Sequence, residues 1–316
     1  MTVVRYDDIR LFLCDPRVHV RNSLRMALND AGLRNQNIWE GGDVDSIMDA
    51  VADPSNYPDV VICDVTDNTD EACQVFSDIR HNELGTNPYI CIIAVAWSPK
   101  QQLVAKVINS GADLLVAAPI SPSLIMERIG SLVHNRKPFV VTSDYIGPDR
   151  RMVEERDAEV EKIDVPNSLR DKALGQFDSA KIREEIDKTR ESVNVQKIDR
   201  QAFQVSYIAD MIIQDYEQNT NKVSRDRLLQ LQKVTNDLKM RAFSAGAKEL
   251  EEICIPLRKV VESLVKCDGD YKKKDIELLT QLSLAVRAAA RPNKGSKDVV
   301  HDISETVIGA NQSATA

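Results

Sequence analysis

The chain has 316 residues, of which 43% are hydrophobic, 28% are charged and only 5% are aromatic, and its formal net charge at pH 7 is -8. This length exceeds the needs of one average domain, so we expect two folded units, or one unit with tails. The composition argues against a β-sandwich, and the negative balance argues against nucleic acid or an anionic membrane as a partner, because phosphate binding requires clustered Lys and Arg. A local basic patch remains compatible with this balance.

The cysteines and the apolar runs narrow the class further. None of the six cysteines forms a C-x-x-C pair, which excludes zinc-ribbon and thioredoxin motifs. Cys14, Cys63 and Cys91 lie inside apolar runs and are expected to be buried free thiols. The first eight residues are too polar for a signal peptide, and no apolar run approaches the roughly 20 residues of a membrane span. A cytoplasmic location is therefore expected.

Residues 9–135 alternate short apolar runs with amphipathic helical periods, which predicts βαβ units that form a parallel sheet. The predicted strands are 9–14, 37–39, 60–63, 89–95 and 114–117. The predicted helices are 18–31, 44–51, 71–79, 102–110 and 122–132. We therefore expect an α/β domain over residues 8–137 with a doubly wound, flavodoxin-like sheet of five strands, whose chemistry lies at the carboxyl ends of the strands.

Residues 138–197 are rich in charge and show no sustained period, which predicts an extended or partly helical linker. One run within it stands apart, namely Tyr145-Ile146-Gly147-Pro148-Asp149-Arg150-Arg151. It is either a plain turn after the last helix or a docking motif whose arginines contact carboxylates.

Four amphipathic stripes over residues 198–292 predict a four-helix bundle. The stripes are Val205, Ile208 and Ile212; Leu228, Leu231, Leu238 and Ala242; Leu250, Ile253, Leu257, Val260 and Leu264; and Ile276, Leu279, Leu282 and Val286. Pro256, within the third stripe, should kink that helix or start a new one. Residues 293–316 are expected to form a flexible tail.

Two acids follow neighbouring strands of the predicted sheet. Asp15 comes directly after the first strand and Asp64 directly after the third, so their carboxylates should converge at one edge. Converging carboxylates repel unless a proton or a hard cation lies between them, which predicts a weak Mg²⁺ site with Asp64 as a nucleophile toward a phosphoryl donor. The alternatives are a solvent-facing acid at Asp64 and a helix cap at Asp15.

Four segments carry a resemblance to a known family: Leu13-Cys14-Asp15-Pro16, Ile62-Cys63-Asp64-Val65, Ser110-Gly111-Ala112-Asp113 and Ala118-Pro119. In order and spacing they resemble the landmarks of a response-regulator receiver domain, similar to the chemotaxis regulator fold. The resemblance covers residues 9–135. It implies a two-component signalling protein in which Asp64 is the phospho-acceptor position and Asp15 and Asp64 hold Mg²⁺.

This sequence departs from the receiver pattern at four positions. Cys14 stands in place of the first acid of the metal-binding pair, and a thiol is a poor ligand for a hard cation. Ala96 replaces the switch hydroxyl, Leu115 the aromatic residue of the fifth strand, and Ala118 the lysine before the proline. Ser98 is a nearby hydroxyl that a backbone shift would bring into the place of the missing one. These departures imply that phosphorylation switching is weakened or absent.

The helical region carries a second, weaker resemblance. The run Asn236-Asp237-Leu238-Lys239-Met240, followed by Gly246, Ala247, Leu250 and Cys254, resembles a histidine phosphotransfer domain. Asn236 occupies the position of the histidine, and an amide does not accept a phosphoryl group as an imidazole does. The resemblance therefore implies a phosphotransfer-like bundle that cannot relay phosphate, and an ordinary four-helix bundle is the alternative.

No set of residues indicates independent catalysis. His19, His81, His134 and His301 lack Ser, Cys or metal-ligand partners at meaningful spacing, and the sequence has no Gly-rich phosphate loop or nucleophile elbow. We therefore do not expect an enzyme.

Three hypotheses about function follow. The first is an atypical receiver that binds signalling proteins, such as a sensor histidine kinase or a downstream regulator. The second is a phosphorylatable response regulator that accepts phosphoryl at Asp64, with the bundle as output or dimerisation domain. The third is a structural protein that self-associates through the bundle.

Overall fold

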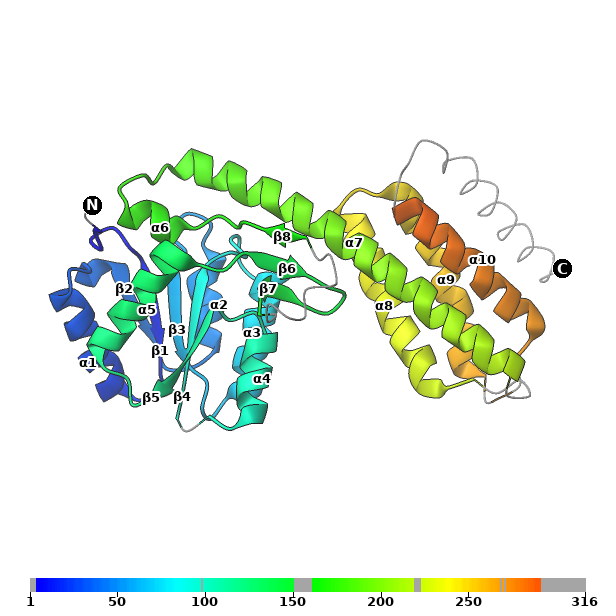
Figure 1. Cartoon of the computed structure of the whole chain (residues 1–316), viewed down its shortest axis with the longest axis horizontal. Coiled ribbons are helices and arrows are strands. Elements are labelled where there is room, and N and C mark those ends of the chain that lie inside the picture. The colour runs from blue at the N-terminus through cyan, green and yellow to red at the C-terminus, as the bar shows by residue number, and fades with distance from the viewer. Residues whose placement is uncertain are drawn as a thin grey trace. The chain divides into compact units, whose positions relative to one another are not determined.

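The computed structural model describes residues 4–97, 99–150, 161–218, 223–267, 269 and 271–290 (Figure 1). The chain divides into two units, Met1–Arg190 and Glu191–Ala316. The predicted tail over 293–316, with His301, lies outside the described residues, as do Ser98 and Arg151.

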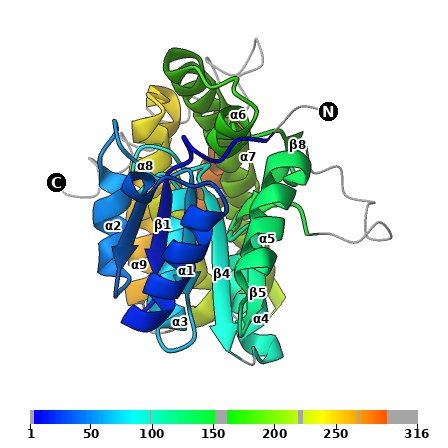
Figure 2. The same ribbon diagram turned by 90° about the vertical axis from the view of Figure 1, so that its left-hand side faces the viewer.

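A parallel sheet of five strands forms the centre of the first unit (Figure 2), in the order β2-β1-β3-β4-β5. The strands are β1 (Leu11–Cys14), β2 (Ile38–Gly41), β3 (Val60–Asp64), β4 (Cys91–Trp97) and β5 (Leu114–Ala118). Every residue of β1 and β3 is buried, as expected for central strands of a parallel sheet that helices cover on both faces. The predicted doubly wound α/β fold is confirmed.

The helices of this unit pack on the two faces of the sheet and form two apolar clusters. They are α1 (Val18–Asp30), α2 (Asp45–Ala52), α3 (Thr69–Arg80), α4 (Gln101–Asn109) and α5 (Pro122–Asn135), with a short 3-10 turn at Asn35–Asn37. One cluster joins α1 and α5 to alternate strand residues, for example Leu28 and Ile129 against Leu11. The other joins α2, α3 and α4, where Phe12 and Phe76 are buried. The period of two along each strand thus divides the core between the two faces.

The segment predicted as a charged linker over 138–197 is instead largely regular structure, and all but its last residues belong to the first unit. Its elements are the strands β6 (Phe139–Val141), β7 (Ile146–Pro148) and β8 (Lys162–Ile163), followed by α6 (Ser168–Ala173) and α7 (Ser179–Gln218). The strands pair antiparallel in the order β7-β6-β8. These strands are two or three residues long, too short to produce a periodic pattern among the charges.

The run that begins at Tyr145 docks onto the loop before β5. Ile146 is 2% exposed, and its carbonyl oxygen lies 2.8 Å from the place where a Cβ on Gly111 would stand. Gly111 also has a φ of +89°, so both its conformation and this close approach require glycine. Arg150 donates to the carbonyl oxygens of Ala112 and Asp113, rather than to the carboxylates that the sequence suggested.

A buried ionic cluster around Asp113 joins β6 and the end of α5 to the sheet. The carboxylate of Asp113 accepts from Arg80 Nη2 at 2.8 Å, from Arg136 Nε at 2.8 Å and from the backbone N–H of Ile92 at 2.8 Å. Both guanidinium groups lie 5.1 Å from the ring centre of Phe139 in β6. Burial acts to raise the pKa of Asp113, but the charges of Arg136 and Arg80 outweigh it and lower that pKa.

The second unit contains four long helices with one shared apolar core. They are the later part of α7, then α8 (Arg225–Ser244), α9 (Lys248–Lys266) and α10 (Lys273–Ala290). Each predicted stripe contributes fully buried residues to this core, for example Val205, Leu231, Leu257 and Leu279. Two details differ from prediction. The first helix begins at Ser179 rather than near residue 198, and α9 continues through Pro256, which is buried within it.

Among the helices of the described ranges, none is long and apolar enough to cross a membrane.

The ionic cluster at Asp113 gives a direct test of this architecture. We expect Asp113→Asn to lower the free energy of unfolding of the first unit by about 3–5 kcal/mol at pH 7, because two buried guanidinium groups lose their counter-charge. Urea titration followed by circular dichroism measures this, and Asp30→Asn, an exposed site on α1, should change stability by less than about 0.5 kcal/mol.

The pH dependence of this difference has a defined sign. The folded pKa of Asp113 is lowered, so its contribution is complete above the unfolded pKa near 3.9 and is lost as the pH falls through the folded value. The gap between wild type and variant should therefore narrow on acidification. A difference below about 1 kcal/mol at pH 7, or one that widens in acid, would contradict the role given to Asp113.

Candidate functional site

The carboxyl ends of β1 and β3 bring Asp15 and Asp64 together. The two strands pair in register with Cys14 opposite Cys63, so that the following residue of each strand reaches the same edge of the sheet. Both acids are largely buried, with side chains that are 9% and 4% exposed. Two carboxylates that lie this close together and are this well shielded from solvent require a positive charge between them.

Arg17 supplies that charge. Its Nη2 lies 2.7 Å from Asp15 Oδ2 and 2.6 Å from Asp64 Oδ2, so one nitrogen bridges the two carboxylates. Its Nε donates to Asp15 Oδ1 at 2.8 Å, and its backbone N–H donates to the same oxygen at 2.8 Å. The Asp15-Pro16-Arg17 sequence thus forms a tight turn before α1 that directs the guanidinium back over the strand ends.

The surroundings keep this guanidinium charged and partly covered. Hydrogen bonding to Asp15 raises the pKa of Arg17, and the charges of Asp15 and Asp64 raise it further, against the opposing effect of burial. The ring of Trp97, at the end of β4, lies 5.2 Å from the Arg17 Cζ atom in a cation–π contact. The backbone N–H of Trp97 donates to Thr66 Oγ1 at 3.1 Å, which ties the end of β4 to the loop after Asp64.

Both oxygens of Asp64 are engaged in this arrangement. Oδ2 accepts from Arg17, and Oδ1 accepts from the backbone N–H of Thr66 at 3.0 Å. Because the side chain is only 4% exposed, neither oxygen is open to an incoming phosphoryl donor in this state.

Two further guanidinium groups and one carboxylate extend the site to β2. Arg21 donates to the carbonyl oxygen of Asp15, and its Nε lies 3.5 Å from Glu40 Oε2. Arg25 Nε lies 3.0 Å from the other oxygen of Glu40. Asp15, Asp64 and Glu40 are therefore matched by three guanidinium groups without a divalent ion.

The residues of this edge do not fit Mg²⁺ as they stand. Mg²⁺ requires oxygen ligands in octahedral geometry, whereas the Cys14 thiol donates to the carbonyl oxygen of Asp43 at 3.1 Å. Hydrogen bonding with Cys14, together with burial, raises the pKa of Cys63 well above its ordinary value, so this thiol is neutral. Within the described part of the chain, no three His, Cys, Asp or Glu side chains are placed to hold a metal ion.

The other altered positions lie at the same end of the sheet. Ala96 is fully buried in β4, and Leu115 and Ala118 are half-buried in β5, where Ala118 pairs with Trp97. None of these side chains offers a hydroxyl or an ammonium group. Ser98, the suggested substitute hydroxyl, lies outside the described residues.

The second unit places its predicted site residues separately. Asn236 is exposed on α8, at the position that the phosphotransfer resemblance gives to a histidine. Cys254 is fully buried in α9, and burial raises its pKa to about 12, so it is an inert core thiol. His19 lies in α1, His81 follows α3 and His134 lies in α5.

Sequence reasoning missed Arg17 and Trp97. A signal for Arg17 was present, since a basic residue two positions after a strand-end Asp and directly after proline lies at the start of a helix beside that acid. The position of Trp97 over the guanidinium depends on the register of β4, which the sequence does not give.

Comparisons with known proteins find similarity in fold. No protein-family profile matches the sequence, and no curated protein sequence matches it. Among solved structures, the chain is similar to the chemotaxis protein CheY4 of Vibrio cholerae, with 15% identity and a TM-score of 0.33 over 39% of this chain and 96% of that one. It is also similar to a CheY-like receiver domain protein of Methanospirillum hungatei, with 15% identity and a TM-score of 0.33 over 39% and 91% of the two chains.

A response regulator receiver protein from Burkholderia phymatum gives 18% identity and a TM-score of 0.34 over 40% of this chain and 94% of that one. The strand order β2-β1-β3-β4-β5 places the first unit in the doubly wound, receiver-like class of α/β folds. Identities this low leave the chemistry of the chain to be argued from its own site.

The bridge formed by Arg17 predicts how the site responds to Mg²⁺. In a Trp39→Phe background, the fluorescence of Trp97 should show no saturable change with a Kd below about 1 mM, because the guanidinium already neutralises Asp15 and Asp64. Arg17→Ala removes that charge and should tighten Mg²⁺ binding at least about 10-fold. Arg128→Ala, which removes a guanidinium of α5 that pairs with Glu127 outside this site, is the control and should leave Mg²⁺ binding unchanged. Submillimolar Mg²⁺ binding by the parent, unchanged in Arg17→Ala, would contradict this reading.

Proposed function

We propose that this protein is an atypical response regulator in two-component signal transduction, which acts through protein–protein contacts with weakened or absent phosphorylation switching. One observation carries the proposal: the Arg17 guanidinium bridges Asp15 and Asp64 at the edge where a receiver would hold its metal ion and phosphoryl group. The receiver-like fold and the resemblance of the strand-end segments support the signalling class.

The distribution of charge around Asp64 supports weakened or absent switching by phosphorylation. A phosphoryl group on Asp64 would raise the negative charge next to Asp15 from one to nearly two. Ala118 has no ammonium group to balance it, and Ala96 has no hydroxyl to donate to the phosphoryl oxygens. Arg17 is the nearest cation, and it is already bonded to Asp15 through both Nε and Nη2.

A phosphorylatable response regulator is the alternative, with Asp64 as the acceptor and the helical bundle as output or dimerisation domain. The specific observation in its favour is also Arg17, whose side chain is 31% exposed and whose planar fork suits phosphate oxygens. In this alternative Arg17 turns from the carboxylate to the phosphoryl group and supplies the missing positive charge.

The helical bundle is proposed as the contact surface rather than as a relay, because Asn236 replaces the phosphotransfer histidine. Its exposed aromatic residues support self-association. Phe203 and Tyr207 on α7 are 50% and 56% exposed and stack with ring centres 6.5 Å apart, and Arg287 of α10 lies 5.4 Å from the Phe203 ring. Light scattering on the full chain tests this part, and a monomer at every concentration would reject a homodimer.

The proposed partners are therefore signalling proteins, such as a sensor histidine kinase or a downstream regulator, together with a second copy of the chain. We further propose a cytoplasmic protein without catalytic activity of its own, and without nucleic acid or membrane as a partner. The negative net charge of the chain supports the last point.

Incubation with acetyl phosphate and Mg²⁺, followed by intact-mass measurement, separates the two candidate functions. We expect no phosphoryl adduct on the wild type, under conditions in which a receiver domain known to phosphorylate itself is converted fully. Asp64→Asn is the matched control, because it keeps the shape of the side chain and removes the acceptor oxygen. An adduct on the wild type that disappears in Asp64→Asn would reject the proposal and establish the alternative.

A further inference from the structure

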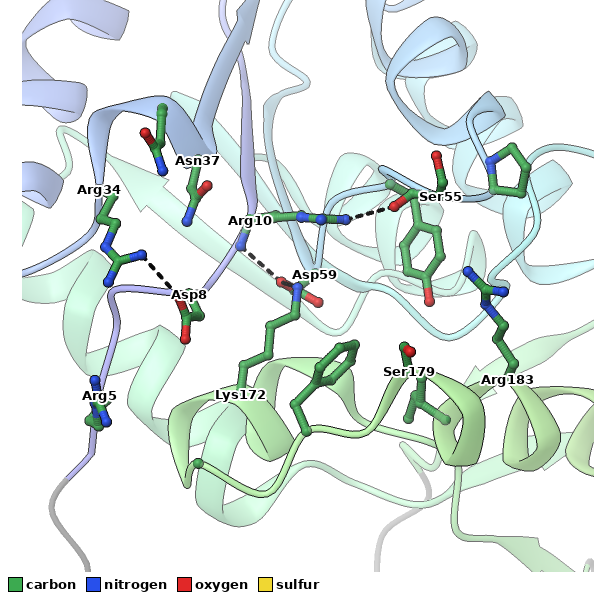
Figure 3. A pocket seen from close by; sticks show the side chains of 16 residues that line it. Arg5, Asp8, Arg10, Arg34, Asn37, Ser55, Asp59, Lys172, Ser179 and Arg183 are labelled. Carbon is green, nitrogen blue, oxygen red and sulfur yellow. Dashed lines mark hydrogen bonds and ion pairs between the residues drawn. The ribbon is translucent and has the colours of Figure 1, made fainter.

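A cavity of about 570 Å³ lies at the opposite end of the central strands from Asp15 and Asp64 (Figure 3). Arg10 precedes β1, and Tyr57 and Asp59 precede β3, so they surround the amino ends of the two strands whose carboxyl ends carry the acids. Lys172 of α6 and Arg183 of α7 complete the opposite wall. This volume is in the usual range for small-molecule sites, and all of the lining residues belong to the first unit.

Most charges around the cavity neutralise one another. Arg34 lies 2.9 Å from Asp7 and 3.2 Å from Asp8, and Arg5 lies 3.2 Å from Asp7. These two cations and two anions therefore balance at the rim.

A buried pair balances a further two charges. Lys172 Nζ lies 2.7 Å from Asp59 Oδ2, with side chains that are 8% and 0% exposed. The same carboxylate oxygen accepts from the backbone N–H of Arg10 at 2.8 Å.

Within the part of the chain that the structure describes, two guanidinium groups of the cavity have no carboxylate partner. Arg10 Nη1 donates only to the carbonyl oxygen of Ser55, at 3.0 Å, while the nearby Asp53 carboxylate accepts from Ser55 instead. Arg183 forms no hydrogen bond or ion pair with any residue of the described ranges. Burial raises the pKa of the Tyr57 phenol, and the positive charges of Arg183 and Arg10 act to lower it. Both arginines therefore lie near the same wall of the cavity. The cavity therefore holds two guanidinium groups that form no ion pair with the described residues, in a chain whose net charge is negative.

A buried acceptor in the wall also lacks a partner. Asp59 is 1% exposed, and its Oδ1 atom is buried without any hydrogen bond, although Oδ2 is fully used. A buried carboxylate oxygen without a donor is costly, and a hydroxyl group of a bound molecule would satisfy it.

We propose that this cavity binds a small hydroxylated phosphate monoester, of the sugar-phosphate class, with its phosphate held by Arg10 and Arg183 and a hydroxyl donating to Asp59 Oδ1. A phosphate monoester is nearly dianionic at pH 7, which suits two guanidinium groups outside any ion pair, and guanidinium forks match its oxygens. The volume exceeds that of inorganic phosphate, which leaves room for the hydroxylated portion. The ligand would join the sheet to the start of α7 and stabilise the first unit, independently of any chemistry at Asp64.

Isothermal titration of the full chain with ribose 5-phosphate, inorganic phosphate and ribose tests the proposal. We expect saturable binding of ribose 5-phosphate, weaker binding of phosphate and none of ribose. Arg183→Gln should weaken ribose 5-phosphate at least about 10-fold, since a charge-assisted hydrogen bond is lost, and Arg10→Gln should do the same. Lys188→Gln, which removes an exposed cation from the same helix, should change the affinity less than about 2-fold.

Thermal unfolding of each variant without ligand shows that it is folded, and Asp64→Asn should bind ribose 5-phosphate like the wild type, which separates this proposal from the proposed function. No saturable binding of ribose 5-phosphate, or equal binding by the wild type and both arginine variants, would overturn the site. Equal affinity for ribose 5-phosphate and inorganic phosphate would overturn the role given to Asp59.

Discussion

The bridge from Arg17 to Asp15 and Asp64 is the interaction on which this account depends. Two carboxylates at neighbouring strand ends, 9% and 4% exposed, repel one another unless a cation lies between them. Here the cation is part of the chain, two residues after the first acid, so it is present at every ion concentration. A metal ligand at position 14 and an ammonium group at position 118 are then unnecessary, and Cys14 and Ala118 are compatible with a stable fold.

The two ends of the sheet differ in what they leave open. At the carboxyl end Asp15, Asp64 and Glu40 are matched by guanidinium groups, and Trp97 lies over that of Arg17. At the amino end, among the residues described, Arg10 and Arg183 have no carboxylate partner and Asp59 has an unbonded oxygen. The positive charge that could bind an anionic signal molecule therefore lies at the amino end of the sheet. The Asp113 cluster joins β6 and the end of α5 to the amino ends of β4 and β5.

The sequence predicted the five strands and five helices of the sheet because apolar runs alternate with helical periods throughout that region, and the strand ends located Asp15 and Asp64. It did not predict β6, β7 and β8, which are too short for a period. Nor did it predict the contacts of Arg17, since the direction of a guanidinium depends on the turn at Pro16 and on the register of three strands. The sequence also did not predict the cavity, because Arg10 and Arg183 lie far apart in the chain and no sequence pattern links them. At Pro256 the local rule predicted a break, yet the helix continues where its apolar face is fully buried.

The most direct test is a crystal structure of the full chain grown with Mg²⁺ and beryllium fluoride, which mimics a phosphoryl group on aspartate. We expect Arg17 Nη2 to remain within hydrogen-bond distance of both Asp15 and Asp64, with no beryllium fluoride bound to Asp64. Mg²⁺ coordinated by Asp15 and Asp64, with beryllium fluoride on Asp64 and the Arg17 side chain displaced, would contradict this expectation.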